Sequence, residues 1–360
     1  MSTTEWGQSG QGFPEGGGSP GARGRPTWLK IIVLLTLLVA LAWVLLLATQ
    51  YYRTKQPLSQ LPGVPDPVAD LFAQPSFEYV NSINGLVNPM GVAIGLDGRV
   101  YVTEAGGERT VHIYNSRGEE LGTFSTPESL APDSIPVYVA INPEGDVYVT
   151  DRSAAAIFIF SPDGESKGEL APPKGYEDWH PLGLTFDSKG NLYVTDVTPE
   201  KHRVVVLDPA GKLKLTFGAQ GEETGQFSYP NGIAVDSEGR IFVADGNNGR
   251  MQAFDQDGKL LFVISRGMSP GDLSIPRGIA IDGDNRLLIA DTSRAAVQVY
   301  KLIDSSGDDA QNSPLKFVGS FNGDAGSGVS FQFPNGLALD GEGKVYVTDR
   351  ANGRVQVWEY

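Results

Sequence analysis

A short pattern recurs six times along most of the chain. Each copy contains a proline, an apolar stretch, a polar turn with glycine or asparagine, and a second apolar stretch that ends in an acidic residue. The copies occupy residues 88–104, 135–151, 180–196, 229–245, 275–291 and 333–349. Because repeated units of this size bury their apolar faces by stacking on one another, the pattern predicts one large repeat domain.

Each repeat predicts four short antiparallel strands. In the fourth repeat these are GIAVD, IFVAD, RMQAF and LLFVI, which are short, alternate in polarity and are rich in β-branched and aromatic residues. Four strands in roughly 45 residues are typical of one blade of a β-propeller. We therefore expect an all-β, six-bladed propeller.

The last repeat leaves room for only three strands before the chain ends at Tyr360. A candidate for its missing outer strand lies at the other end of the domain, because residues 77–85 align with residues 316–323, the outer strand of the preceding repeat. We expect residues 77–80 to pair with 355–358, which would close the ring at six blades and cover an exposed sheet edge.

These units resemble NHL repeats, most fully over residues 217–254 and 321–358. The resemblance extends over nearly all of residues 77–360 and implies a six-bladed NHL-type propeller. The architecture alone does not determine function, because the same fold serves enzymes, sensors and adhesion modules.

The N-terminal residues predict a different organisation. Residues 1–27 are rich in glycine, serine and proline and predict a disordered tail. Residues 31–49 carry no charge and are long enough to span a bilayer, which predicts a transmembrane helix over 28–52; a cleaved signal peptide is the alternative. Residues 53–76 contain many prolines and predict a stalk before the propeller at 77–360.

Charge suggests an orientation for this membrane anchor. Three basic residues precede the apolar segment and two follow it, which places the N-terminus in the cytoplasm and the propeller outside the cell membrane. An anchor followed by a propeller resembles the sensor portions of some bacterial receptor kinases, and the absence of Asn-x-Ser/Thr sequons suits a bacterial surface. We therefore expect a single-pass, membrane-anchored protein of bacterial type.

Composition excludes several functions. The chain has a net charge of −15, and residues 61–360 alone carry −18, so this domain should repel nucleic acid. There is no cysteine, which excludes disulfides and thiolate metal sites.

An acidic residue ends the second strand of every repeat. Asp245 and Asp349 are each followed, five residues later, by an arginine, Arg250 or Arg354. A ring of carboxylates could hold a metal or a substrate. A feature present once in each blade is better explained as structure, with each aspartate capping its loop and pairing with the arginine. Arg109, Arg203 and Arg294 are candidates for the same role in other blades.

The positions at which blades differ are more informative. The residue after each repeat proline should lie near the mouth of the channel, and Asn231, Arg277 and Asn335 form a polar arc over blades 4 to 6. This arc, together with His180 in a mouth loop, could bind a small polar or anionic ligand. The alternative is that these side chains cap loop backbones or line a water-filled channel.

The same residues do not favour an enzyme. Asn231 and Asn335 resemble metal-ligand asparagines of gluconolactonase–paraoxonase-type calcium hydrolases, but the inner strands GVAI, YVAI, GLTF, GIAV, GIAI and GLAL offer no carboxylate. The zinc of the NHL-like amidating lyases is held by histidines, and the three histidines here cannot converge. We expect no catalytic residues, no metal and no cofactor. The favoured function is a protein- or ligand-binding module for scaffolding, adhesion or sensing; the alternative is a lyase or lactone hydrolase.

Overall fold

The structure, a computed structural model, describes residue 49 and residues 77–129, 131, 133–303, 314–323 and 328–359. The expected tail, membrane helix and stalk at 1–27, 28–52 and 53–76 lie outside these residues, apart from Thr49. Among the residues described, no helix has both the length and the apolar character needed to cross a membrane.

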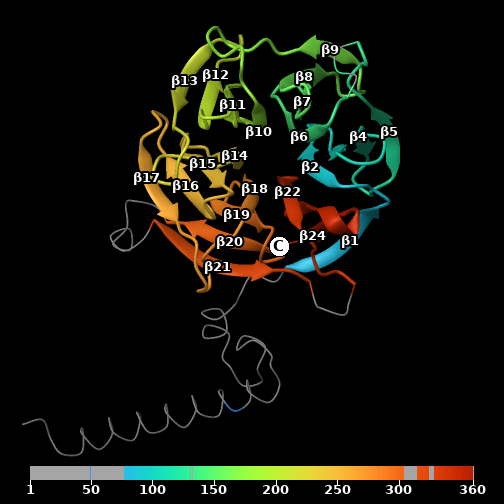
Figure 1. The fold of residues 1–360 in the computed structure, drawn as a ribbon. Helices are drawn as coiled ribbons and strands as arrows, with labels where there is room; N and C mark the ends of the chain where they lie inside the picture. The colour runs from blue at the N-terminus through green and yellow to red at the C-terminus, as the bar shows by residue number, and fades with distance from the viewer. Residues whose placement is uncertain are drawn as a thin grey trace, which may run out of the picture. The chain divides into compact units, whose positions relative to one another are not determined.

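Six four-stranded antiparallel sheets are arranged around a central axis, so the expected all-β six-bladed propeller is confirmed (Figure 1). From the axis outwards, blade 1 is β2 (Pro89–Ile94), β3 (Val100–Glu104), β4 (Val111–Tyr114) and β5 (Glu120–Phe124), and blade 2 is β6 (Pro136–Ile141), β7 (Val147–Asp151), β8 (Ala156–Phe160) and β9 (Ser166–Glu169). Blade 3 is β10 (Pro181–Phe186), β11 (Leu192–Asp196), β12 (Arg203–Leu207) and β13 (Leu213–Phe217), and blade 4 is β14 (Pro230–Val235), β15 (Ile241–Asp245), β16 (Arg250–Phe254) and β17 (Leu260–Ile264). Blade 5 is β18 (Pro276–Ile281), β19 (Arg286–Asp291), β20 (Ala296–Leu302) and β21 (Leu315–Phe321), and blade 6 is β22 (Pro334–Leu339), β23 (Lys344–Asp349), β24 (Arg354–Glu359) and β1 (Glu78–Asn84).

The closure of the ring between the two ends of the domain is also confirmed. β1 pairs antiparallel with β24 from Glu78↔Glu359 to Asn84↔Arg354, with an irregularity between Tyr79 and Asn81. The pairing extends four residues beyond the segment expected from sequence. In Figure 1, β1 lies beside the red strands of the C-terminus. Blade 6 is thus made from both ends of the domain.

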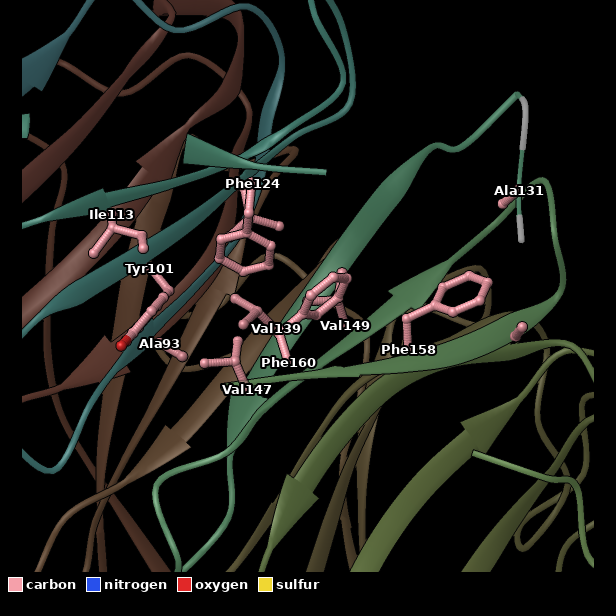
Figure 2. Packing of buried hydrophobic residues seen from close by; sticks show 12 residues of the cluster. Ala93, Tyr101, Ile113, Phe124, Ala131, Val139, Val147, Val149, Phe158 and Phe160 are labelled. Carbon is pink, nitrogen blue, oxygen red and sulfur yellow. The ribbon is translucent and has the colours of Figure 1, made fainter. Parts of the chain in front are cut away.

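Apolar clusters hold neighbouring blades together. In the described part of the chain, one cluster lies between each pair of adjacent blades, so the core is a ring of interfaces. Figure 2 shows the interface of blades 1 and 2, where Phe124 and Phe160 pack with ring centroids 4.5 Å apart. Each strand of the middle pair is buried on both faces, which is why its sequence is almost continuously apolar.

Threonine hydroxyls add polar links between blades. In four blades the second-to-last residue of the second strand is a buried threonine. Its hydroxyl donates to a backbone carbonyl in the inner strand of the next blade. The links join Thr103 to Val137, Thr150 to Leu182, Thr195 to Asn231 and Thr348 to Met90, at 2.7–2.9 Å. Blades 4 and 5 have Ala244 and Ala290 at this position. In blade 5 the hydroxyl of Thr292, two residues further on, donates instead to the Pro334 carbonyl of β22 at 2.7 Å.

Candidate functional site at the channel mouth

We call the face that carries the connections into each inner strand the top face. Near this face neighbouring inner strands lie very close together. In most of them a glycine stands two residues after the repeat proline. A β-carbon on Gly183 would lie 1.9 Å from the Asn231 carbonyl oxygen, and one on Gly232 would lie 2.4 Å from that of Arg277. Glycine is therefore required there by close packing of the neighbouring backbone.

Blade 2 departs from this rule, because Tyr138 replaces the glycine. Its ring is buried in the cluster between blades 2 and 3, against which Met90 also packs. Its hydroxyl lies 3.5 Å from the Asn335 amide nitrogen, at the limit of a hydrogen bond. Since Asn335 belongs to blade 6 and Tyr138 to blade 2, the two side chains meet across blade 1.

The polar arc expected from sequence has a definite geometry. Arg277 Nη1 donates to Asn231 Oδ1 at 2.9 Å, and the Asn231 amide donates to the Tyr229 carbonyl at 2.7 Å. Asn335 donates to the Met90 carbonyl at 2.9 Å. Both asparagines are 2% exposed, so they brace loop backbone, whereas Arg277 is only half-buried.

A second arginine lies near this arc. Arg350 begins the short 3₁₀ helix η3 (Arg350–Asn352), and its amide donates to the Phe333 carbonyl at 3.3 Å. Burial raises the pKa of the Tyr138 phenol, and this is opposed by the charge of Arg277, the hydrogen bond from Asn335 and the charge of Arg350. Both guanidinium groups therefore act on the same buried hydroxyl.

His180 does not join the arc. Its backbone amide donates to Asp196 Oδ1 at 2.8 Å, and its ring Nδ1 lies 3.0 Å from the Asp178 carbonyl oxygen. The ring is exposed, and in the described part of the chain it contacts neither Asn231 nor Arg277. The structure thus brings together two of the four expected ligand-binding residues directly, Asn231 and Arg277, with Asn335 nearby through Tyr138.

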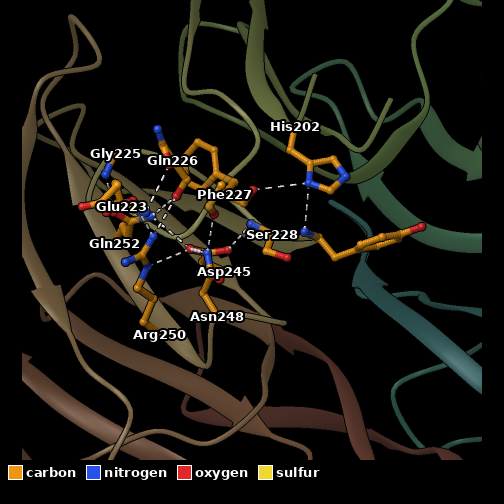
Figure 3. A network of polar contacts seen from close by, with 12 residues as sticks. His202, Glu223, Gly225, Gln226, Phe227, Ser228, Asp245, Asn248, Arg250 and Gln252 are labelled. Carbon is orange, nitrogen blue, oxygen red and sulfur yellow. Dashed lines mark hydrogen bonds and ion pairs between the residues drawn. The ribbon is translucent and has the colours of Figure 1, made fainter. Parts of the chain in front are cut away.

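The aspartate–arginine pairs of the repeats are internal to the top-face loops, and Figure 3 shows the pair of Asp245 and Arg250. Asp245 is completely buried; one carboxylate oxygen accepts from the Ser228 amide at 2.7 Å, and the other from Arg250 Nε and the Asn248 amide, both at 2.8 Å. Burial raises the pKa of Asp245, and these hydrogen bonds oppose the shift. Asp349 and Arg354 form the same pair at 2.8 Å. These contacts account for the four residues without a ligand.

The other blades vary this arrangement. Arg203 pairs with Asp196 at 2.8 Å, and Arg294 lies 3.5 Å from Asp291. The expectation for Arg109 was wrong, because His112 and not Arg109 lies beside the acidic residue of blade 1, with Nε2 3.5 Å from Glu104. Arg109 adopts a left-handed turn conformation, with φ of 58°, before β4 begins.

The channel below the mouth contains no ionisable side chain among its lining residues. A cavity of about 320 Å³ is lined by the last three residues of each inner strand, of which only Thr185 is polar. In the described residues, no group of three histidine, cysteine, aspartate or glutamate side chains is placed to hold a metal ion.

Sequence reasoning missed two further features of the top face. The inner strand of blade 2 reads YVAI, with Tyr138 in place of the glycine of the other blades. The role of Tyr138 depends on its contact with Asn335, which the sequence does not indicate. Tyr229 and Phe333, each the residue before a repeat proline, are 51% and 53% exposed and have φ of 51° and 60°. Nothing in the sequence pattern indicates these left-handed conformations.

The chain is similar in sequence to known proteins. Residues 227–254, 273–300 and 331–358 match the NHL repeat family. The chain is 28% identical over 180 residues to NHL repeat-containing protein 3 of Mus musculus, covering 45% of this chain and 50% of that protein. It is 39% identical over 90 residues to the probable peptidyl-alpha-hydroxyglycine alpha-amidating lyase pgal-1 of Caenorhabditis elegans, covering 24% of this chain and 25% of that protein.

A solved streptogramin B lyase structure has the same fold, with a TM-score of 0.54 over 79% of this chain and 97% of that one. The sequence identity is 17%, so this likeness concerns the fold alone. The chain spans at most about half of the length of these curated relatives.

Proposed function

We propose that this chain, whose NHL repeats form a six-bladed β-propeller, is a binding module that holds a protein partner on its top face. The observation that carries the proposal is the pair of exposed aromatic residues, Tyr229 and Phe333, on either side of blade 5. Aromatic side chains are enriched in protein interfaces and among the residues that dominate binding energy.

The conformation of the two residues supports the proposal. A left-handed backbone costs a residue other than glycine about 1–3 kcal/mol unless its surroundings impose it. Asparagine tolerates this conformation well, and Asn88 occupies the equivalent position of blade 1 with φ of 55°. Tyr229 and Phe333 adopt it although half of each side chain gains no burial from it. Binding a partner would give these rings the burial that the isolated chain does not provide.

Exposed apolar side chains elsewhere provide a matched control. Leu121 and Leu261, on the outer strands β5 and β17, are 56% and 46% exposed. We expect proteins cross-linked to the full-length chain in its own cells to be lost from the Tyr229→Ala/Phe333→Ala variant and retained by Leu121→Ala/Leu261→Ala. An identical set of cross-linked proteins from both variants would argue against the top face.

We also propose that residues 28–52 anchor the chain in the cell membrane, with the N-terminus in the cytoplasm and the propeller outside. The uncharged segment 31–49 and the excess of basic residues before it support this arrangement. Protease added to intact cells should release the propeller. If the propeller survives on intact cells and is cleaved only after lysis, the orientation is the reverse.

A second candidate is a lyase with its site at the mouth, favoured by the similarity to pgal-1 over 90 residues. A metal-dependent catalyst should change in thermal stability on addition of Ca²⁺ or Zn²⁺ or of a chelator, because a ligand that binds only the folded state raises the melting temperature. Our expectation for the full-length chain is little change. A shift of several degrees that a chelator reverses would favour the lyase over the binding module.

A further inference from the structure

We propose that the centre of the top face binds an anionic side chain of the protein partner, with Arg277 and Arg350 as its charge partners. This inference rests on the proposed function and specifies the chemistry of its partner, an acidic segment that carries apolar residues beside the charge.

Most charged groups of the domain are acidic, and several arginines of the top face are already paired. Residues 61–360 carry a net charge of −18, and top-face arginines such as Arg203, Arg250 and Arg354 are each paired with a buried aspartate. In the described part of the chain, neither Arg277 nor Arg350 forms a salt bridge. Two arginines without counter-ions, on a domain with an excess of carboxylates, make a local site for an anion.

Arg277 and Arg350 also have hydrogen-bond donors to spare. A guanidinium group has five N–H donors and no acceptor. Arg277 gives one of them to Asn231 Oδ1, and among the described residues no side-chain hydrogen bond of Arg350 is found. The buried Tyr138 hydroxyl accepts from Asn335 but donates to no group in that part of the structure. The mouth therefore offers several unused donors, which suit a carboxylate or phosphoryl group.

The two arginines are connected by hydrogen bonds to the exposed aromatic residues. Tyr229, Asn231 and Arg277 are linked in series, because the Tyr229 carbonyl accepts from Asn231 and Asn231 accepts from Arg277. On the other side, the Arg350 amide donates directly to the Phe333 carbonyl. Each of the two arginines without a salt bridge is thus linked by hydrogen bonds to the backbone of one exposed aromatic residue, so a segment that contacts both rings would lie close to both arginines.

Carboxylate and phosphoryl groups share the chemistry that this site would recognise. The test uses the purified full-length chain, immobilised, and a library of hexapeptides with aromatic and aliphatic residues around one fixed position. The fixed residue is glutamate, phosphoserine or the neutral glutamine. We expect the glutamate or the phosphoserine peptides to be retained at least about 10-fold better than the glutamine peptides, as one charge-assisted contact would give.

The decisive variant is Arg277→Gln/Arg350→Gln, in which the preference for charge should fall to about 1-fold. Arg277→Lys/Arg350→Lys should keep part of it, because the charge remains but the planar fork is lost. The matched control is Arg152→Gln/Arg117→Gln, which removes the same charge; Arg152 follows Asp151 as Arg350 follows Asp349. The control should bind as the unaltered chain does, and circular dichroism checks the folding of every variant.

If the glutamate peptides are retained best, the site binds a carboxylate. If the phosphoserine peptides are retained best, the site binds a phosphoryl group. Equal retention of charged and neutral peptides overturns the inference, as does a charge preference that survives Arg277→Gln/Arg350→Gln. The cross-linking experiment separates the two proposals. If its partners depend on Tyr229 and Phe333 but not on the two arginines, the binding module stands and the anion site fails.

Discussion

Asp245 organises a top-face loop through a single buried side chain. Its carboxylate accepts from a backbone amide, an arginine, an asparagine and Gln252, and it has no exposed surface. Sequence indicated the pairing of Asp245 with Arg250 from their spacing alone. It did not indicate that Gln252, and Gln356 beside Asp349, would complete the network.

We predict that Asp245→Asn lowers the free energy of unfolding by about 3 kcal/mol or more, because it leaves the partly buried Arg250 without its counter-charge. The measurement is urea denaturation at neutral pH. Asp163→Asn is the control, since Asp163 pairs with Arg99 at 2.6 Å but is 78% exposed. An exposed pair contributes less than about 1 kcal/mol. Equal losses in the two variants would contradict the structural role of the buried pair.

At the scale of the element, the inner strands are joined through side chains and not through a continuous sheet. The threonine hydroxyls of β3, β7, β11 and β23 reach the next blade, whereas β15 and β19 have alanine there. At the junction of blades 4 and 5 the contact from Arg277 to Asn231 provides a polar link instead. Blade 5 reaches blade 6 through a different threonine, because the Thr292 hydroxyl donates to the Pro334 carbonyl of β22 at 2.7 Å.

We expect Thr195→Val to cost about 1–3 kcal/mol, because valine has nearly the same shape but leaves the Asn231 carbonyl without this donor. Thermal and urea unfolding measure the loss. Thr123→Val, on the exposed face of β5, should change stability by less than about 0.5 kcal/mol. A neutral Thr195→Val would mean that the hydroxyl link contributes nothing to the packing of blades 3 and 4.

At the scale of the whole molecule, closure of the ring depends on β1. The strand contributes Ile83 to the cluster between blades 6 and 1, and Tyr79 packs edge-on against Trp358 with ring centroids 5.7 Å apart. Phe77 stacks on Phe321 of blade 5 at 4.6 Å. Residues at the start of the domain therefore hold together the two blades at its end.

A fragment that begins at residue 84 should consequently be destabilised by more than about 3 kcal/mol relative to one that begins at residue 70. The shorter fragment loses the burial of Ile83, worth about 1.5–3 kcal/mol, and the hydrogen bonds of a whole strand. Urea unfolding of the two fragments is the comparison. Equal stability would show that β1 is dispensable for closure.

The buried tyrosines give the whole domain an alkaline limit. Burial raises the pKa of Tyr101, Tyr114, Tyr148, Tyr193 and Tyr346, in the case of Tyr114 to about 12. In the unfolded chain these phenols ionise near pH 10, so above that pH the folded state binds more protons than the unfolded state. The stability gained from neutral phenols is present below pH 10 and is lost as the pH rises further.

We therefore expect the free energy of unfolding to fall steadily from about pH 10 to about pH 12. Urea unfolding at a series of pH values tests this. Tyr114→Phe should make the fall shallower, because phenylalanine has no hydroxyl to ionise. A pH dependence identical to that of the unaltered chain would show that Tyr114 ionises alike in both states.

The sequence by itself determined the number of blades, the four strands of each and the pairing of the two ends of the domain. It could do so because these features follow from the periodicity within each repeat. The six copies of the repeat carry this pattern independently of one another. Asn231, Arg277 and Asn335 each follow the proline that begins β14, β18 and β22, because the repeat fixes their register.

Only the tertiary structure decided which of these residues meet. Tyr138 lies near Asn335 although nearly two hundred residues separate them, and Arg350 joins the mouth from a loop whose sequence resembles that of Arg152 in blade 2. His180 immediately precedes the inner strand β10, as Tyr229 and Phe333 precede theirs, yet its ring lies beside the Asp178 carbonyl and does not join the arc. Such contacts depend on how the blades tilt and pack around the axis of the closed ring. All six repeats together determine that geometry, and no single repeat specifies it.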